Sequence, residues 1–313
     1  MRKVILDMDP GVDDALAILL AFRSPELEIL GITTVSGNVD AGKGAVNALR
    51  TLRVLEIKDV PVYVGQSKPL LRQLETAELV HGLDGLGDAN IPMPSRKPEE
   101  GSGVKFIVDT IMNSKPNEIT LISTGPLTNI ATAILLEPNL AKSVKELIIM
   151  GGAFALTPYG IGNVTPVSEF NIYGDPEGAK IVFESGIPLT AVGLDVSTDP
   201  KAILTKDKYE HLAISSSETA QFAAAITRNF INRFGFVELH DPMAVTMVID
   251  KSFFKTSKYH VVIATNNGAT RGQTVVDRRK ELLHKEFRKP PNVNIAHWVN
   301  GSRFLQSFMR RIK

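Results

Sequence analysis

Short apolar runs alternate with amphipathic stretches along most of the chain. Runs bounded by glycine, proline or polar residues are typical of buried strands, and they occur at residues 4–8, 29–35, 60–64, 119–123, 147–150 and 189–192. Between most of them the apolar positions have helical spacing, which predicts helices at 13–22, 41–55, 104–112, 129–136 and 176–184. This alternation indicates an α/β fold: a mainly parallel, twisted, Rossmann-like open sheet flanked by helices.

The remaining segments continue the alternation of strands and helices and show no boundary between domains. Residues 200–236 are predicted to be mostly helical, 260–264 and 273–276 to be further strands, and 303–312 to be a closing helix. Two polar, glycine-containing stretches, 86–103 and 160–167, are predicted to be surface loops. The chain contains no repeat, low-complexity tract or strong linker signal, so we expect one domain over residues 1–313.

Four carboxylates lie just after the first predicted strand, at Asp7, Asp9, Asp13 and Asp14. Pro10 and Gly11 end the strand, and a helical stripe follows. The acids therefore lie at a strand's C-terminal end and a helix's N-terminus, where parallel α/β sheets bind ligands. Asp13 and Asp14 could simply cap the helix. However, so many like charges at one sheet edge favour a cation, and oxygen ligands favour Ca²⁺ or Mg²⁺ over zinc.

Other polar groups also stand where predicted strands end. They are Ser36-Gly37-Asn38, the segment 123–129, Glu169-Phe170-Asn171 and His240-Asp241-Pro242. Each has a structural alternative. The first two are typical of turns with helix caps. Glu169 and Asn171 could belong to a solvated loop, and Asp241 could be a helix N-cap followed by Pro242 at the first helical position.

Charge and composition narrow the function classes. The net charge of +1 gives no strong field for a nucleic-acid polymer or a membrane surface. The chain has no cysteine, which excludes disulfides, thiolate metal sites and a cysteine nucleophile. This composition fits a reducing compartment, and we expect a cytoplasmic protein. The chain enters a strand at once, so no signal peptide is expected, and no apolar run is long enough for a membrane span.

The polar motifs together resemble the nucleoside hydrolase family, the calcium-dependent nucleoside N-ribohydrolases. Asp7-Met8-Asp9-Pro10-Gly11-Val12-Asp13-Asp14-Ala15 is similar to the family's N-terminal signature. His81-Gly82-Leu83-Asp84-Gly85-Leu86-Gly87 is similar to its histidine-glycine loop. Thr124-Gly125-Pro126-Leu127-Thr128-Asn129, Glu169-Phe170-Asn171 and His240-Asp241-Pro242 resemble its later motifs, in the same order. The resemblance runs from residue 4 to about 250.

The resemblance implies a role for each matching residue. Calcium would be held by the side chains of Asp9, Asp14 and Asp241 and the main-chain carbonyl of Thr124. Asp9 would also be the general base for a calcium-bound water. The ribose hydroxyls would be held by Asp13, Asn38, Asn163, Glu169 and Asn171. The base would face His81, Phe170 and His240, with His240 the candidate acid for the departing base. The family also implies a homodimer or homotetramer.

These residue types suit cleavage of an N-glycosidic bond to ribose and a free base. Positive charge develops on the sugar in the transition state, and carboxylate and amide oxygens stabilise it. A metal lowers the pKa of a water molecule. The base leaves poorly as an anion, so a histidine that donates a proton assists it. Asp7 is predicted to orient the metal ligands.

The expected substrates are uridine and cytidine, ahead of inosine. Family members with histidine before the metal-binding aspartate usually accept inosine, uridine or pyrimidine nucleosides, and His240 holds that position. Residues 226–239 contain Phe230, Phe234 and Phe236 but no tyrosine, which argues against efficient purine cleavage, although these phenylalanines could be helix core. Two other functions stay open: a non-catalytic calcium-dependent nucleoside-binding protein, and a haloacid-dehalogenase-like phosphatase suggested by Asp7 and Asp9.

Overall fold

The central sheet is built from the apolar runs of the sequence. The structure, a computed structural model, describes residues 1–279 and 289–313. Eight strands pair in the order β3-β2-β1-β4-β5-β6-β12-β9. In that order they are Val62–Val64, Leu27–Thr34, Arg2–Met8, Ile119–Ser123, Glu146–Met150, Leu189–Val192, Val293–Val299 and Phe254–Tyr259. All neighbours are parallel except β12 and β9. The predicted, mainly parallel α/β fold is therefore confirmed.

All six strands predicted in the first part of the chain are present, and the later strands differ from expectation. The third strand begins at Val62 and not at residue 60, after Pro61, which has no amide hydrogen to donate. The strands expected at 260–264 and 273–276 form a separate hairpin, β10 (Val261–Ile263) and β11 (Thr274–Val276). The sequence analysis did not predict β9 or β12, which complete the sheet.

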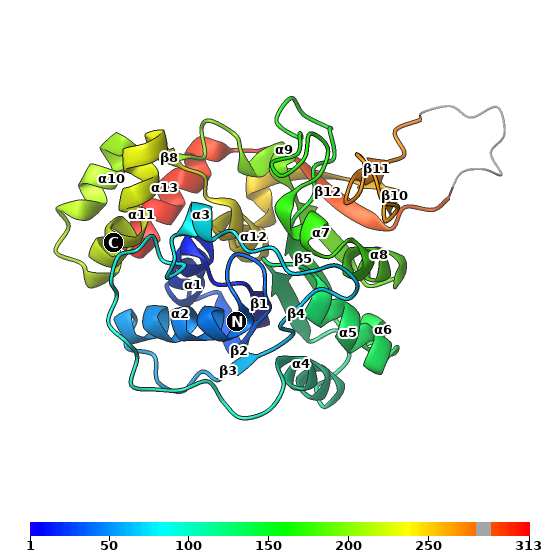
Figure 1. Ribbon diagram of the computed structural model, residues 1–313, viewed down its shortest axis with the longest axis horizontal. Coiled ribbons are helices and arrows are strands. Elements are labelled where there is room, and N and C mark those ends of the chain that lie inside the picture. Colours follow the sequence, from blue (N-terminus) through cyan, green and yellow to red (C-terminus); the bar gives the residue numbers. More distant parts are fainter. Residues whose placement is uncertain (280–288) are drawn as a thin grey trace.

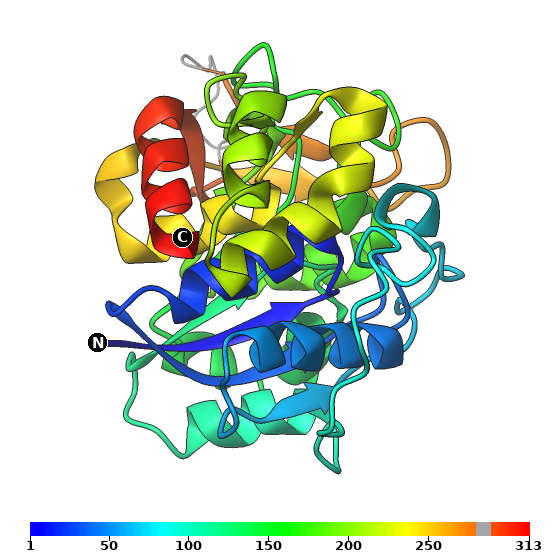
Figure 2. The ribbon, with the colours of Figure 1, turned by 90° about the vertical axis from the view of Figure 1, so that its left-hand side faces the viewer.

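Helices cover both faces of the sheet (Figures 1 and 2). One face carries a core formed with α1, α2, α10, α11, α12 and α13, which span Val12–Phe22, Ala41–Val54, Lys206–Ala213, Glu218–Phe234, His240–Ile249 and Gly301–Ile312. The other face packs against α4, α5, α6, α7 and α8, which span Gly103–Met112, Thr128–Leu136, Leu140–Ser143, Phe170–Gly174 and Pro176–Glu184. Short helices α3 (Glu78–His81) and α9 (Leu194–Ser197) and a small sheet of β7 (Leu204–Thr205) with β8 (Phe236–Val237) complete the chain.

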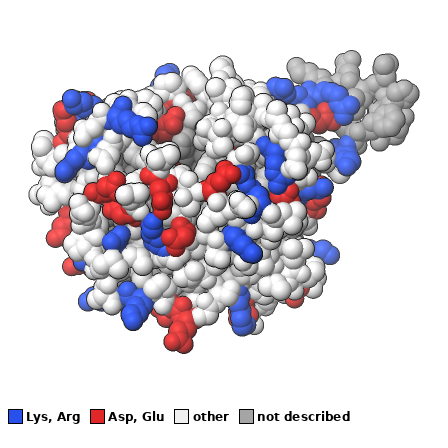
Figure 3. Space-filling model, in the orientation of Figure 1, with Lys and Arg blue, Asp and Glu red and all other residues white. Residues whose placement is uncertain are grey.

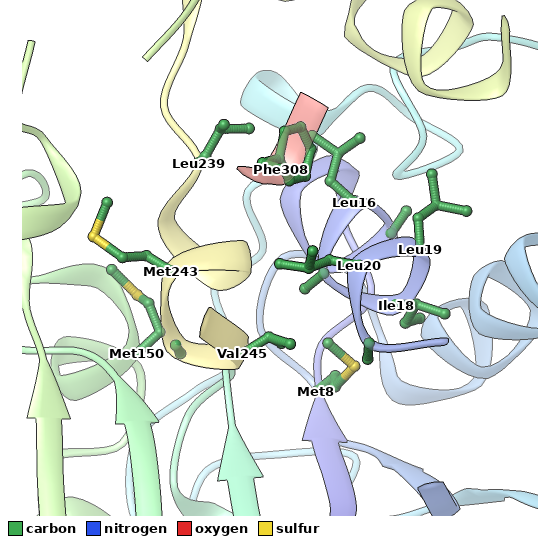
Figure 4. Packing of buried hydrophobic residues seen from close by; sticks show 14 of the residues in the cluster. Met8, Leu16, Ile18, Leu19, Leu20, Met150, Leu239, Met243, Val245 and Phe308 are labelled. Carbon is green, nitrogen blue, oxygen red and sulfur yellow. The ribbon is translucent and has the colours of Figure 1, made fainter. Parts of the chain in front are cut away.

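Strand β1 and helices α1 and α12 form the centre of the first core. Met8, Leu16, Leu20, Met243 and Val245 pack together at this point (Figure 4). All five side chains are at most 1% exposed. Each contributes about 1.5–3 kcal/mol through removal of apolar surface from water. The site-bearing ends of β1, α1 and α12 are therefore fixed against one another by a rigid core.

The loops and the surface match the sequence analysis. Residues 86–102 and 160–167 contain no helix or strand, as predicted, whereas Gly103, which was included in the first predicted loop, begins α4. Acidic and basic side chains are interspersed over the face in Figure 3. Among the described residues, none of the helices combines the length and apolar character needed to cross a bilayer.

Candidate active site

The predicted site residues meet at the C-terminal ends of the strands. Strand β1 lies between β2 and β4, and the chain crosses from one side of it to the other between β3 and β4. Open α/β sheets bind ligands in the crevice at such a switch point. A pocket of about 340 Å³ lies there. The predicted residues that line it are Asp13, Asn38, His81, Thr124, Asn163, Glu169, Phe170, Asn171, His240 and Asp241.

Carboxylates gather at the floor of this pocket. One oxygen each of Asp13, Asp14 and Asp241 lie within 4.8 Å of one another, a spacing that a single metal ion can bridge. Asp14 and Asp241 are the predicted side-chain ligands, whereas the sequence analysis assigned Asp13 to the ribose. Burial, with the charge of Asp13, raises the pKa of Asp14 to about 6. Burial and then the charges of Asp13, Asp14 and Asp9 raise the pKa of Asp241 well above its usual range.

Asp9 lies beside this cluster and is fully buried. Its Oδ2 accepts a hydrogen bond from the amide of Asn38 at 2.7 Å. Burial, followed by the charge of Asp14, raises its pKa well above the usual range. Within the described part of the chain, Asp9 Oδ1 and Asp13 Oδ1 are buried without a hydrogen-bond partner. Unpartnered buried carboxylate oxygens beside further acids are the donor set that a hard cation needs, so these residues fit a bound calcium or magnesium ion.

Asp14 connects several elements of the site. It accepts hydrogen bonds from the Gly11 amide at 3.0 Å, from Asn38 Nδ2 at 3.1 Å and from Thr124 Oγ1 at 2.7 Å. The bond from the Gly11 amide caps α1, in agreement with the interpretation of Asp14 as a helix cap. The bonds from Asn38 and Thr124 come from the loops after β2 and β4. Asp14 is therefore both a helix cap and a group held at a fixed position in the site.

Two glycines allow the backbone to approach Asp9. A Cβ atom at Gly37 would overlap Asp9 Oδ2, and one at Gly125 would lie 2.9 Å from Asp9 Oδ1. Any larger residue at these positions would displace the carboxylate. The turns after β2 and β4 thus enclose Asp9.

Asp7 lies one layer below the pocket and has no contact with it. Its carboxylate accepts hydrogen bonds from Thr33 Oγ1 at 2.6 Å and Asn129 Nδ2 at 2.7 Å, and a longer one from Ser123 Oγ at 3.4 Å. Its main-chain carbonyl accepts from the Thr124 amide at 2.9 Å. Burial raises the pKa of Asp7 to about 6. These bonds hold the end of β4, and with it Thr124, in place.

The Glu169-Phe170-Asn171 motif is part of the site and not a solvated loop. Glu169 is 2% exposed and is the N-cap of α7. Asn171 Nδ2 donates to the carbonyl oxygens of Thr124 at 2.7 Å and Met150 at 3.1 Å. Asn163 Oδ1 accepts from the Phe170 amide at 3.0 Å. The interpretation of Glu169 and Asn171 as a solvated loop is therefore wrong, because both are buried and bonded.

In the His240-Asp241-Pro242 motif, Asp241 is not the helix N-cap that was the structural alternative to a functional role. The helix begins at His240, and its N-cap is Leu239 without a side-chain cap bond. Asp241 lies inside the first turn, so Pro242 is at the third helical position. The N-cap interpretation of Asp241 is wrong. The helix begins early enough to direct Asp241 toward the acids of α1.

His81 is buried at one wall of the pocket. Its Nδ1 accepts a hydrogen bond from the Val12 amide at 3.1 Å, so that nitrogen carries no proton. Burial lowers the pKa of His81 to about 4. A neutral imidazole with its Nδ1 occupied can only offer Nε2 to a ligand.

His240 is held by two side chains that the sequence analysis did not single out. Ser197 Oγ lies 2.8 Å from its Nδ1, and Glu238 Oε2 lies 3.3 Å from its Nε2. Burial lowers the pKa of His240, but the hydrogen bond to Glu238 and nearby negative charges outweigh burial and raise it above the usual value. Glu238 could have been noticed as a carboxylate two residues before a candidate acid. Nothing in the sequence pairs Ser197 with His240.

Part of the lining of the pocket is an apolar wall. It includes Phe230, Phe234 and Phe236. Phe234 and Phe236 are 48% and 38% exposed. These two are therefore not helix core, and the wall offers aromatic faces suited to a planar ring.

Comparison with known proteins agrees with this geometry. The sequence model described as "Inosine-uridine preferring nucleoside hydrolase" matches residues 4–306. The chain is 38% identical to "Probable uridine nucleosidase 2" of Arabidopsis thaliana, over 99% of this chain and 97% of that protein. It superposes on a plant nucleoside hydrolase with a TM-score of 0.91 at 33% identity, covering 99% and 98% of the two chains. A purine-preferring ribonucleoside hydrolase from Gardnerella vaginalis gives 0.90 at 34% identity, covering 99% and 98%.

Proposed function

Since the chain belongs to the inosine-uridine preferring nucleoside hydrolase family, we propose that it cleaves uridine and cytidine in preference to inosine. Hydrolysis of ribonucleosides is the activity of the family, whereas the preference for pyrimidines and the mechanism below are our proposal. The observation that supports the mechanism most is the convergence of five separate sequence motifs on one pocket. The phosphatase alternative has no such support, because the family match accounts for the same aspartates.

We assign calcium to the acidic floor of the pocket. Its ligands would be Asp9, Asp14, Asp241 and the Thr124 carbonyl, and Asp13 is close enough to take part. When bound, calcium supplies positive charge that lowers the pKa of a water molecule and fixes it beside the ribose.

Asp9 is the proposed general base. Its Oδ1 is buried without a hydrogen-bond partner among the described residues, and its Oδ2 is fixed by Asn38. It accepts the proton as the water oxygen bonds to the anomeric carbon. The electron pair of the glycosidic C–N bond leaves with the base.

The ribose would be held by Asp13, Asn38, Asn163, Glu169 and Asn171, all of which line the pocket. Their oxygens stabilise the positive charge that develops on the sugar, and this electrostatic contribution is largest in the transition state. Glu169 and Asn171 are fixed by bonds to the backbone, so little reorganisation is needed during the reaction.

The base would lie against Phe170 and the apolar wall, between His81 and His240. His240 is the proposed proton donor to the departing base, because histidine can carry a proton at neutral pH. Phenylalanine at positions 230, 234 and 236 supplies stacking surface without hydroxyl groups, which supports the preference for pyrimidines. The similarity to a uridine nucleosidase points the same way. A cytoplasmic location and assembly as a homodimer or homotetramer stay predictions.

The test is ribose release from uridine, cytidine, inosine and adenosine, each with added calcium and with a chelator. We expect calcium-dependent release, with uridine and cytidine ahead of the purine nucleosides. A ranking led by inosine would overturn the pyrimidine assignment. Binding without release from any of the four would favour the non-catalytic alternative.

A further inference from the structure

A glutamate and a serine hold the ring of His240 from opposite sides. Glu238 Oε2 lies 3.3 Å from Nε2, and Ser197 Oγ lies 2.8 Å from Nδ1. A histidine ring held at one nitrogen can still turn about its Cβ–Cγ bond. A partner at each nitrogen opposes that rotation and fixes the direction of the Nε2 proton.

The two holding groups come from rigid parts of the fold. Glu238 follows β8, which pairs with β7 through Leu204 and Val237. Ser197 ends α9 and is completely buried. The same short helix carries Asp195, whose carboxylate accepts hydrogen bonds from the backbone amides of residues 154, 156 and 157. Neither partner of His240 is therefore on a free-standing loop.

Glu238 belongs to the lining of the pocket and is not one of the clustered acids at its floor. It lines the pocket together with its neighbours Phe236 and Val237. Its side chain is 36% exposed, whereas that of His240 is 16% exposed. The carboxylate is thus the more exposed member of the pair, and both residues line the pocket. A base bound in the pocket would replace Glu238 as the acceptor of the Nε2–H.

We propose that Glu238 is a positioning residue, which keeps the His240 Nε2–H facing the pocket until an acceptor atom of the departing base replaces Glu238 as its partner. The inference rests on the proposed function, in which His240 donates the proton. Ser197 completes the arrangement by holding Nδ1. Glu238 itself forms no bond to the sugar and takes no part in activating water.

A pair of substrates separates this role from a structural one. Uridine needs its leaving group to be protonated. The p-nitrophenyl β-D-ribofuranoside releases p-nitrophenolate, a stable anion that leaves without a proton donor. Both substrates need the same ribose contacts and the same water. A residue that acts only through His240 should therefore affect the first substrate and spare the second.

The experiment compares kcat of Glu238→Gln, Glu238→Asp and Ser197→Ala with the unaltered enzyme on both substrates. The expected result for Glu238→Gln is a loss of about 10- to 100-fold with uridine, part of what proton donation contributes. The loss with the p-nitrophenyl riboside should be less than about threefold. Glu238→Asp, which keeps a shorter carboxylate, should recover part of the uridine activity, and Ser197→Ala should show the same selectivity as Glu238→Gln. Glu210→Gln, an exposed glutamate on α10, is the matched control and should leave both rates unchanged.

Two results would overturn the proposal. One is an equal loss on both substrates, which would mean that Glu238 supports the fold or the ribose end of the pocket. The other is an unchanged uridine rate in Glu238→Gln. Failure of the unaltered enzyme to cleave either substrate is a different outcome, because it contradicts the proposed function itself.

Discussion

At the scale of single residues, the site depends on polar side chains that bond more than one partner, and Asn171 is one of them. The Asn171 amide nitrogen bonds two carbonyl oxygens, those of Thr124 and Met150. Its own oxygen is the atom that can accept a hydrogen bond from a ribose hydroxyl. Substitution therefore removes a substrate contact and leaves buried acceptors unpaired.

We expect Asn171→Ala to raise KM and lower kcat. Ribose contacts strengthen as positive charge develops, so the loss should be greater in the transition state than in the bound substrate. The size should be about 1–3 kcal/mol, which is roughly 5- to 150-fold in kcat/KM. Steady-state kinetics with uridine measure it, with the exposed Asn267→Ala as control. An unchanged kcat would mean that Asn171 binds substrate and transition state equally.

Asp9→Asn tests the general base. Asparagine has the same shape and can stay within the enclosing glycines, but it cannot accept the proton of the water. We expect a loss of ribose release of at least about 10²–10⁴-fold in a protein that still unfolds in one cooperative transition. The exposed Asp207→Asn provides the comparison. Residual activity close to that of the unaltered enzyme would assign the base elsewhere, Asp13 being the nearest candidate.

Gly37→Ala tests how closely the backbone encloses Asp9. The added methyl group would overlap Asp9 Oδ2, so the carboxylate or the turn must move. Displacements of this kind cost about 100-fold in rate even where the chemistry is intact. Gly42→Ala is the matched control, because the nearest atom to its Cβ is a side-chain oxygen of Asp40 at 3.2 Å. Equal activity of the two variants would show that Asp9 tolerates movement.

At the scale of elements, the hairpin of β10 and β11 supports the loops of the site from outside the central sheet. Thr274 Oγ1 donates to the Ala153 carbonyl at 2.7 Å, and Ser168 Oγ donates to the Arg271 carbonyl at 2.6 Å. Arg271 Nη2 also donates to both carboxylate oxygens of Glu177 of α8, at 2.7 and 2.8 Å. The hairpin thus joins α8 to the segment that precedes Glu169.

Arg271→Ala should lower the free energy of unfolding by about 1.5–3 kcal/mol, the range for hydrogen bonds to charged groups. The Arg271 and Glu177 side chains are only 18% and 17% exposed, so water does not replace the pair fully. Arg279→Ala makes a useful contrast, because that arginine is 56% exposed beside Asp277 and solvent screens its pair, so the loss of stability should be smaller. Urea unfolding measures both. Similar losses in the two variants would contradict the distinction between half-buried and exposed pairs.

The strands that were predicted from the sequence differ physically from the strands that were missed. Strands such as β4 are buried along their whole length and give a continuous apolar run, which is visible in the sequence. Strand β9 lies at the sheet edge and carries exposed polar residues, so it gives no such run. Strand β12 has only two residues in register with β6, and its place depends on a pairing across about a hundred residues of chain. Such pairings follow from tertiary packing.

The site also contains features that were predicted from the sequence and features that were missed. Asp9, Asp14 and Asp241 were predicted because each belongs to a short motif with its own spacing. The proximity of Asp13 to Asp241 and the Ser197–His240 bond join distant segments, and no local pattern encodes them. The sequence therefore predicted the chemical groups of the pocket, whereas the structure supplied their pairing.

At the scale of the whole molecule, the acidic floor opposes folding when no cation is bound. Asp9, Asp14 and Asp241 are buried beside the partly exposed Asp13, and loss of solvation raises the pKa of each. In the unfolded chain the same groups are solvated and far apart. A cation that binds only the folded arrangement removes this repulsion, so it should stabilise the entire fold and not the site alone.

We expect calcium to raise the melting temperature and a chelator to lower it. By mass action the stabilisation is about 2.7 kcal/mol when free calcium is about 100 times its Kd. Magnesium should give a smaller shift, because it demands a strict octahedral geometry and releases its waters reluctantly.

Asp241→Ala removes a charge that the metal would neutralise. This variant should therefore unfold at the same temperature with and without calcium, and at or above the unaltered protein in chelator. Differential scanning calorimetry of both proteins with calcium, with magnesium and with chelator measures these shifts. A calcium shift that survives in Asp241→Ala would place the stabilising ion outside the pocket floor, and no shift in the unaltered protein would remove calcium from the assignment.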